Sequence, residues 1–174
     1  MMQEYTITVF SENNIGLLNE ITIVFSRRKI NIESLTVSES EVKGVSRYTI
    51  VAFMDEGKVE NIVLQIEKII GVFKAIYFEA EEIVHQEVAL IKIAISNKLN
   101  GNLEALVRNH NARILTVGPD FLVIERVGYK AGNQELFQEL EPYGVLQFAR
   151  SGRVAISTSQ KDFTSYLKGL AEAS

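Results

Sequence analysis

Two short polar turns flank one apolar-periodic helix near the start of the chain. The first turn covers residues 13–16, and the second is centred on Asn31. A helix N-terminus presents backbone N–H groups that have no intrahelical partner, and such groups bind carboxylates. The amide oxygen of Asn31 is a suitable acceptor for an ammonium group. With a small apolar pocket for a side chain, these turns could hold a free amino acid.

Simpler explanations exist for the same residues. Gly16 could be only a turn glycine at a strand-to-helix junction, and Asn13 and Asn14 can cap the helix. The cations at residues 27–29 come at the C-terminal end of the helix, where they complement the helix dipole. The spacing by itself leaves both the binding and the structural interpretation of Gly16 open.

Composition excludes several classes of chemistry. The chain has 174 residues, no cysteine and a formal net charge of -4, which excludes disulfides and thiolate metal sites and disfavours nucleic acid as a partner. His85 and His110 lack paired ligand spacing, and no phosphate loop or nucleophile elbow is present. The longest apolar run, residues 50–54, is too short to span a membrane, and no basic, apolar leader opens the chain. We expect a cytoplasmic, non-catalytic protein that binds no metal, nucleic acid or membrane.

Hydrophobic periodicity in the first half predicts one βαββαβ unit. Alternating apolar residues around residues 5–9 predict a strand, and apolar spacing of three and four predicts a helix from Gly16 to about Lys29. Two strands follow at 31–38 and 46–53, joined by a turn around Lys43 and Gly44. The remaining elements are a helix over 59–70 closed by Gly71 and a strand over 72–79.

The second half repeats this order after an acidic break at 79–87. Its expected elements are strands at 88–96, 113–117, 121–127 and 145–150, helices after Gly101 and around 136–140, a strand extension through 153–157 and a final helix at 163–170. We therefore predict an α+β protein with two ferredoxin-like βαββαβ domains in tandem, residues 1–80 and 81–174. Each sheet would keep an open face and an edge strand, which favours a homodimer.

The two halves differ in their first helix. Aligning residues 115–117 with residues 35–37 places Asn111 opposite Asn31. Ten positions then separate Gly101 from Asn111, whereas fifteen separate Gly16 from Asn31, which predicts a helix shorter by more than one turn in the second half. An effector site is therefore expected only in the first half.

The motifs of the first half resemble a known family. Residues 13–18 match the loose Asn/Asp-x-x-Gly-x-Leu turn of ACT domains. Residues 25–37 match Phe-Ser-x-Arg-x-x-Asn-Ile-Glu-Ser-Leu-Thr-Val, and residues 46–50 match Ser-Arg-x-Thr-Ile. These two motifs resemble the N-terminal ACT domain of the small regulatory subunits of acetolactate synthase, also called acetohydroxyacid synthase. In the second half, residues 87–93 and 149–152 resemble that family's Arg-Glu-x-x-Leu-x-Lys and Ala-Arg-Ser-Gly segments, while 97–110 and the tail after Thr158 match weakly.

This resemblance implies a dimeric regulatory subunit that activates a separate catalytic subunit. It implies feedback inhibition by valine or another branched-chain amino acid, with thiamine diphosphate, magnesium and FAD on the catalytic partner and no cofactor in this chain. A free-standing ACT-domain sensor of another amino acid, without a synthase partner, is the alternative. The residues that the resemblance maps to the effector pocket are Asn13, Gly16, Leu17 and Leu18 of one chain with Asn31 and Ile32 of its dimer mate.

Overall fold

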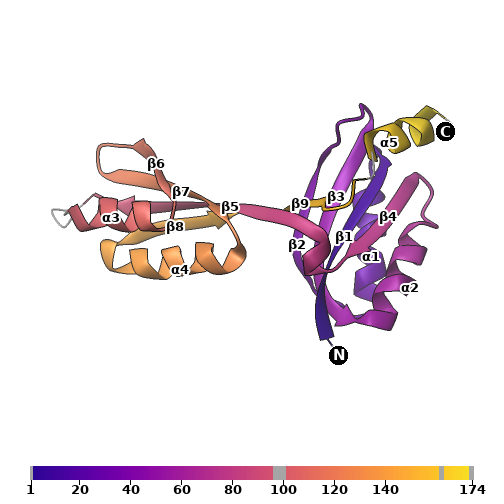
Figure 1. Ribbon diagram of the computed structural model, residues 1–174, viewed down its shortest axis with the longest axis horizontal. Helices are drawn as coiled ribbons and strands as arrows, with labels where there is room; N and C mark the ends of the chain where they lie inside the picture. The colour runs from indigo at the N-terminus through magenta and orange to yellow at the C-terminus, as the bar shows by residue number, and fades with distance from the viewer. Residues whose placement is uncertain (1, 96–100, 161–162, 173–174) are drawn as a thin grey trace. The chain divides into compact units, whose positions relative to one another are not determined.

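The chain folds into two compact α+β units. The computed structural model describes residues 2–95, 101–160 and 163–172. Unit 1 comprises Met1–Val84 together with Arg153–Ser174, and unit 2 comprises His85–Gly152 (Figure 1). The elements are β1 Met2–Glu12, α1 Leu17–Arg27, β2 Ile32–Glu39, β3 Val45–Asp55, α2 Glu56–Ile66, β4 Val72–Phe78, η1 Ala80–Glu82, β5 Ile83–Ala94, α3 Gly101–Asn109, β6 Arg113–Val117, β7 Phe121–Gly128, α4 Lys130–Leu140, η2 Glu141–Tyr143, β8 Val145–Arg150, β9 Val154–Ser157 and α5 Phe163–Glu172.

Unit 1 contains the predicted βαββαβ arrangement. Its four-stranded antiparallel sheet has the order β2-β3-β1-β4. The strands β3 and β1 are therefore central, and β2 and β4 form the two edges. Alternate residues of β1 point to opposite faces. Tyr5, Ile7 and Val9 pack on one face against apolar residues of α1 and α2, such as Phe25 and Ile62, and all are fully buried. The amphipathic spacing of the two helices thus places both on the same face of the sheet.

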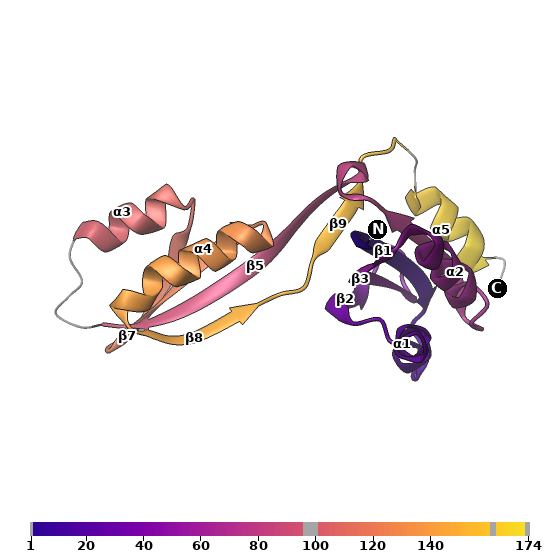
Figure 2. The same ribbon diagram turned by 90° about the horizontal axis from the view of Figure 1, so that it is seen from below.

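The opposite face of this sheet is covered by the C-terminal segment. Figure 2 shows β9 on the side of β1 and β3 that faces away from α1 and α2. There the Arg153 guanidinium donates to Thr6 Oγ1 and to Glu4 Oε1, both at 2.7 Å. Leu167 of α5 packs, fully buried, in a cluster that includes Phe10. The residues from Arg153 onward therefore belong to unit 1, which differs from the predicted division into 1–80 and 81–174 because this face needed an apolar and hydrogen-bonding cover.

Unit 2 is a second ferredoxin-like sandwich, which confirms the predicted tandem fold class. Its strands have the order β6-β7-β5-β8. Figure 2 shows α3 and α4 on one side of this sheet. Fully buried Ile91, Ile124 and Leu136 bring one strand pair and α4 into a common core.

The structure corrects the predicted alignment of the two first helices. Helix α1 has 11 residues and α3 has 9, so the difference is about half a turn and not more than one. Asn111 has a positive φ of 53° and closes α3, as Lys29 with a φ of 55° closes α1. In each case the next residue donates back into the helix, Ile30 to Phe25 and Ala112 to Val107. Asn111 therefore corresponds to Lys29 and not to Asn31.

Candidate functional site

The start of α1 is built by a left-handed glycine. Gly16 has a φ of 96° and is the N-cap, and no side chain hydrogen-bonds to the helix start. The prediction that Asn13 or Asn14 caps the helix is therefore wrong: Asn14 Nδ2 instead donates to Glu12 Oε2. Because a side chain is disfavoured at positive φ, the sequence needs glycine here. The first-turn N–H groups are left to water or to a ligand.

A shallow hollow of about 430 Å³ adjoins this helix start, lined by Gly16, Leu18, Asn19, Thr22 and Leu35. Two leucine side chains and the first residues of α1 line it. The Thr22 hydroxyl donates to the Leu18 carbonyl at 3.0 Å, which is one turn earlier in the same helix. The hollow thus offers helix-start N–H groups beside an apolar surface, which are two of the three features that an apolar amino acid requires.

The predicted site residues do not all gather in this hollow. Gly16 and Leu18 line it, whereas Asn13 is exposed in the preceding turn, where its N–H donates to the Gly44 carbonyl at 3.0 Å. Leu17 is buried and faces Gly71: its Cδ1 lies 3.2 Å from the position that a Cβ at Gly71 would occupy. Leu17 therefore anchors the first turn of α1 to the core.

Asn31 and Ile32 lie at the other end of α1. Asn31 lines a separate hollow of about 420 Å³ with Arg28 and Lys29, and its Nδ2 donates to Glu33 Oε1 at 3.1 Å. Ile32 begins β2 and packs against the core of unit 1. An 11-residue helix is about 16 Å long. Within one chain, then, Asn31 and Gly16 lie at opposite ends of the helix.

The cations at the end of α1 behave as the dipole argument predicts. Arg28 Nη1 donates to the Val24 carbonyl at 3.4 Å, in the last turn of the helix. The last carbonyls of a helix lack donors from a following helical turn, so a guanidinium that donates to one of them is favourable at this end.

Thr22 and Leu35 were not singled out by the sequence. Thr22 follows Leu18 by four residues, so helical periodicity places both on one face of α1. Leu35 reaches the hollow because β2 is the edge strand beside α1, which depends on the strand order and not on local spacing. Helical periodicity could therefore have predicted the position of Thr22, whereas the position of Leu35 could not be predicted without the strand order.

Apolar side chains extend from this hollow across the neighbouring surface. Ile15 is fully exposed, and Leu18 and Val37 are exposed to 44% and 41%. Val37 belongs to the unpaired edge of β2. An exposed apolar patch beside an open strand edge is the usual form of a protein–protein contact.

Two features are absent from the described parts of the chain. Within residues 2–95, 101–160 and 163–172, no helix is long and apolar enough to cross a membrane. Across the same residues, no group of three or more His, Asp or Glu side chains is arranged to hold a metal ion.

Comparison with known proteins identifies the class and then the family. A model of the AHAS small subunit-like ACT domain matches residues 7–74, and a model of the small subunit of acetolactate synthase matches residues 86–159. Together with the βαββαβ topology of β1 to β4, the first match defines residues 7–74 of unit 1 as an ACT domain. The second match and the relatives below show that the chain belongs to the acetolactate synthase small-subunit family, as the motifs indicated.

Curated relatives and a solved structure cover nearly the whole chain. The acetolactate synthase small subunit of Mycolicibacterium smegmatis is 35% identical over 153 residues, which are 88% of this chain and 90% of that protein. The Bacillus subtilis protein of the same name is 35% identical over 158 residues, covering 89% and 92%. The crystal structure of the small subunit from Thermotoga maritima superposes with a TM-score of 0.83 at 28% identity, covering 91% of this chain and 99% of that one.

Proposed function

We propose that this chain is a non-catalytic, cytoplasmic regulatory subunit that binds the catalytic subunit of acetolactate synthase, activates it and conveys feedback inhibition by valine or another branched-chain amino acid. Thiamine diphosphate, magnesium and FAD belong to the catalytic partner in this proposal. The supporting observation is the hollow at Gly16, where uncapped helix N–H groups meet the apolar side chains of Leu18 and Leu35. Family membership favours this function over a free-standing sensor.

The effector site in this proposal is shared between two chains. Gly16 and Leu18 of one chain bind the carboxylate and the alkyl side chain of the effector, and Asn31 of the second chain accepts from the ammonium group. The length of α1 supports sharing, because a helix of about 16 Å separates Asn31 from the Gly16 turn of the same chain. The exposed edge of β2, with Val37 and Leu35, provides the surface on which a second copy would pair antiparallel.

Feedback then follows from linkage. The effector favours the dimer arrangement to which it binds more tightly, and the holoenzyme in that arrangement is less active. Because the coupling is reciprocal, the catalytic subunit must also alter the affinity of this chain for valine.

Reconstitution tests the proposal. The chain is added to the catalytic acetolactate synthase subunit of the same organism, and acetolactate formation is measured with and without valine. We expect co-purification, increased activity and inhibition by valine, with no turnover by this chain alone. A chain that neither co-purifies with the catalytic subunit nor raises its activity would instead be a free-standing sensor.

The substitution Gly16→Asp separates activation from inhibition. An added carboxylate at the helix start repels the carboxylate of the effector. Nothing lies within 4 Å of a Cβ at this position, so the side chain meets no clash, but the positive φ of 96° strains the backbone of any residue other than glycine. We expect lost valine sensitivity and retained activation. Gly16→Asn is the matched control, because asparagine has the same size as aspartate and a similar tolerance of positive φ but carries no charge. A Gly16→Asp synthase as sensitive to valine as the parent would place the effector elsewhere.

A further inference from the structure

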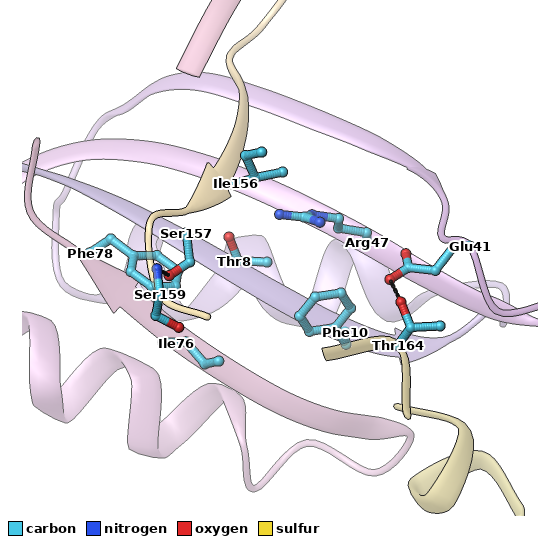
Figure 3. A pocket seen from close by; sticks show the side chains of 10 residues that line it. All are labelled: Thr8, Phe10, Glu41, Arg47, Ile76, Phe78, Ile156, Ser157, Ser159 and Thr164. Atoms are coloured by element: carbon cyan, nitrogen blue, oxygen red, sulfur yellow. Dashed lines mark hydrogen bonds between the residues drawn. The ribbon is translucent and has the colours of Figure 1, made fainter. Parts of the chain in front are cut away.

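A second cavity, of about 260 Å³, lies on the outer face of the unit 1 sheet, between the sheet and the C-terminal segment (Figure 3). Its floor comes from β1, β3 and β4, and its cover comes from β9 and the residues that follow it. The hollow at Gly16 shares no lining residue with it. The effector proposal therefore leaves this cavity unexplained.

One cation projects into this cavity. The Arg47 guanidinium donates to the Ala155 carbonyl and lies 5.4 Å from the centre of the Phe10 ring. Burial lowers the pKa of Arg47, and the nearby charge of Glu41 raises it. Arginine remains protonated in proteins, so a partly desolvated positive charge faces the cavity while its hydrogen-bonding partner in the described part of the chain is a neutral carbonyl.

A buried hydroxyl faces the same space. Thr8 is only 2% exposed, and its Oγ1 has no hydrogen-bond partner among the residues that the structure describes. Figure 3 shows this hydroxyl beside the guanidinium of Arg47, both directed into the cavity. Burying a hydroxyl without a partner costs free energy that an acceptor would recover. The site thus combines an unsatisfied donor with a cation.

The remaining lining residues define the shape and charge of a ligand. Ile76, Phe78 and Ile156 supply the apolar part of the lining, and Ser157, Ser159 and Thr164 supply hydroxyl groups beside them. Glu41 lies at the opposite end, where its Oε1 accepts from Thr164 Oγ1 at 3.0 Å. One guanidinium can bind a carboxylate through two parallel hydrogen bonds. A phosphate dianion, in contrast, would bring a second negative charge close to Glu41 with a single cation to balance it.

We propose that this cavity binds a small aliphatic monocarboxylate, whose carboxylate pairs with Arg47 and accepts from Thr8 while its alkyl chain contacts Ile76, Phe78 and Ile156. The site is separate from the effector hollow and does not depend on the proposed function. A ligand bound here contacts both the sheet and the C-terminal segment, so it stabilises the folded state of unit 1 by linkage.

Titration of the full chain with sodium isobutyrate tests this site, with sodium chloride at equal ionic strength as the reference. The methyl resonances of Ile76 and Ile156 report binding. We expect saturable shifts, weakening of the affinity by about tenfold or more in Arg47→Gln and a smaller loss in Thr8→Val, which keeps the side-chain shape. Arg27→Gln, at an exposed position on α1, is the matched control and should bind as the parent does. Thermal unfolding of each variant verifies that it is folded.

Several results would overturn the site. Shifts that grow without saturation, or that chloride reproduces, would show only general salt effects. A folded Arg47→Gln protein that binds as tightly as the parent would show that Arg47 does not bind the carboxylate. If that variant fails to fold, unchanged binding by Thr8→Val would likewise contradict the proposed site. Isobutyrate also resembles valine, so Gly16→Asp is titrated as well. Loss of the Ile76 and Ile156 shifts in that variant would mean that the ligand acts from the effector hollow.

Discussion

Arg153 is a buried charge whose partners lie at the opposite end of the sequence. It is 5% exposed, and its guanidinium is held by Glu4 and Thr6, while its backbone N–H donates to Ser34 Oγ at 2.9 Å. Burying a guanidinium without a carboxylate is costly, because the charge loses its favourable interaction with water and gains no opposite charge in exchange. The pair therefore specifies where the C-terminal segment returns to the sheet.

Glu4→Ala should lower the free energy of unfolding of unit 1 by about 2 kcal/mol. This is less than the full cost of leaving a buried charge without its partner, because the Glu4 side chain is 32% exposed and water can partly replace its carboxylate. Urea unfolding measures this change. Lys58→Met breaks an exposed ion pair with Asp55, 3.2 Å long, and should cost less than about 1 kcal/mol. Equal losses in the two variants would contradict the assignment of Arg153 as a buried charge.

Lys74 gives a pH-dependent contribution to stability. Its Nζ lies 2.6 Å from Glu67 Oε1, and this hydrogen bond raises the pKa of Lys74 above its ordinary value of 10.5. A raised pKa in the folded state stabilises the fold below the ordinary value, and the contribution disappears as the pH rises through the folded value. The side chain is 37% exposed, so the contribution is small.

We therefore expect Lys74→Met to lower the free energy of unfolding by less than about 1 kcal/mol between pH 7 and 9. The difference between variant and parent should shrink as the pH rises beyond 10.5, which urea unfolding at a series of pH values can follow. A difference that stays constant through this range would mean that the lysine stem, and not its charge, contributes the stability.

At the scale of elements, α5 packs on the outer face of the unit 1 sheet, in a small apolar cluster separate from the core beneath α1 and α2. Leu167 is fully buried in a cluster with Phe10, Val42 and Val45, whereas its neighbour Tyr166 is 46% exposed. Leu167→Ala removes buried apolar volume and should cost about 2 to 4 kcal/mol. Tyr166→Ala, the control from the same helix turn, should change the stability far less. Thermal unfolding distinguishes them, and comparable losses would show that α5 packs less tightly than the structure indicates.

Elements with strong periodicity were predictable because burial on one face dictates their spacing. Residues 21 and 25 of α1 and residues 62 and 66 of α2 recur at four-residue spacing, and residues 5, 7 and 9 of β1 alternate. Helix ends were predicted less well. Apolar residues continue to Ile70, but α2 ends at Ile66 because the chain must turn toward β4.

At the scale of the whole chain, sequence repetition predicted two similar units but not their boundary. Arg153 contacts Glu4 across almost the entire sequence, and no local pattern identifies such a partner. The outer cavity could not be predicted from the sequence either, because Thr8, Arg47 and Ile156 come together only after the C-terminal segment has returned to the sheet. Gly16 and Asn31 were found because local turn chemistry marks them, while Leu35 needed knowledge of the strand order.

The proposed sharing of the effector site between two chains makes a stoichiometric prediction. In a heterodimer with Gly16→Asp in one chain and Asn31→Ala in the other, both substitutions fall in the same shared site and the second site is intact. Removing the Asn31 acceptor leaves an ammonium group unpaired, at about 1 to 3 kcal/mol. Heterodimers purified through two different tags and titrated calorimetrically should therefore retain half of the valine sites of the parent.

The complementary heterodimer pairs a parent chain with a chain that carries both substitutions. Here each of the two shared sites is damaged once, since one contains the altered Gly16 and the other contains the altered Asn31, so high-affinity binding of valine should disappear from both. Pockets built within single chains would reverse the two results: the first heterodimer would lose both sites and the second would keep one. The pair of titrations thus decides whether α1 contributes its two ends to one effector site or to two. One remaining site in each of the two heterodimers would instead mean that Asn31 takes no part in binding the effector.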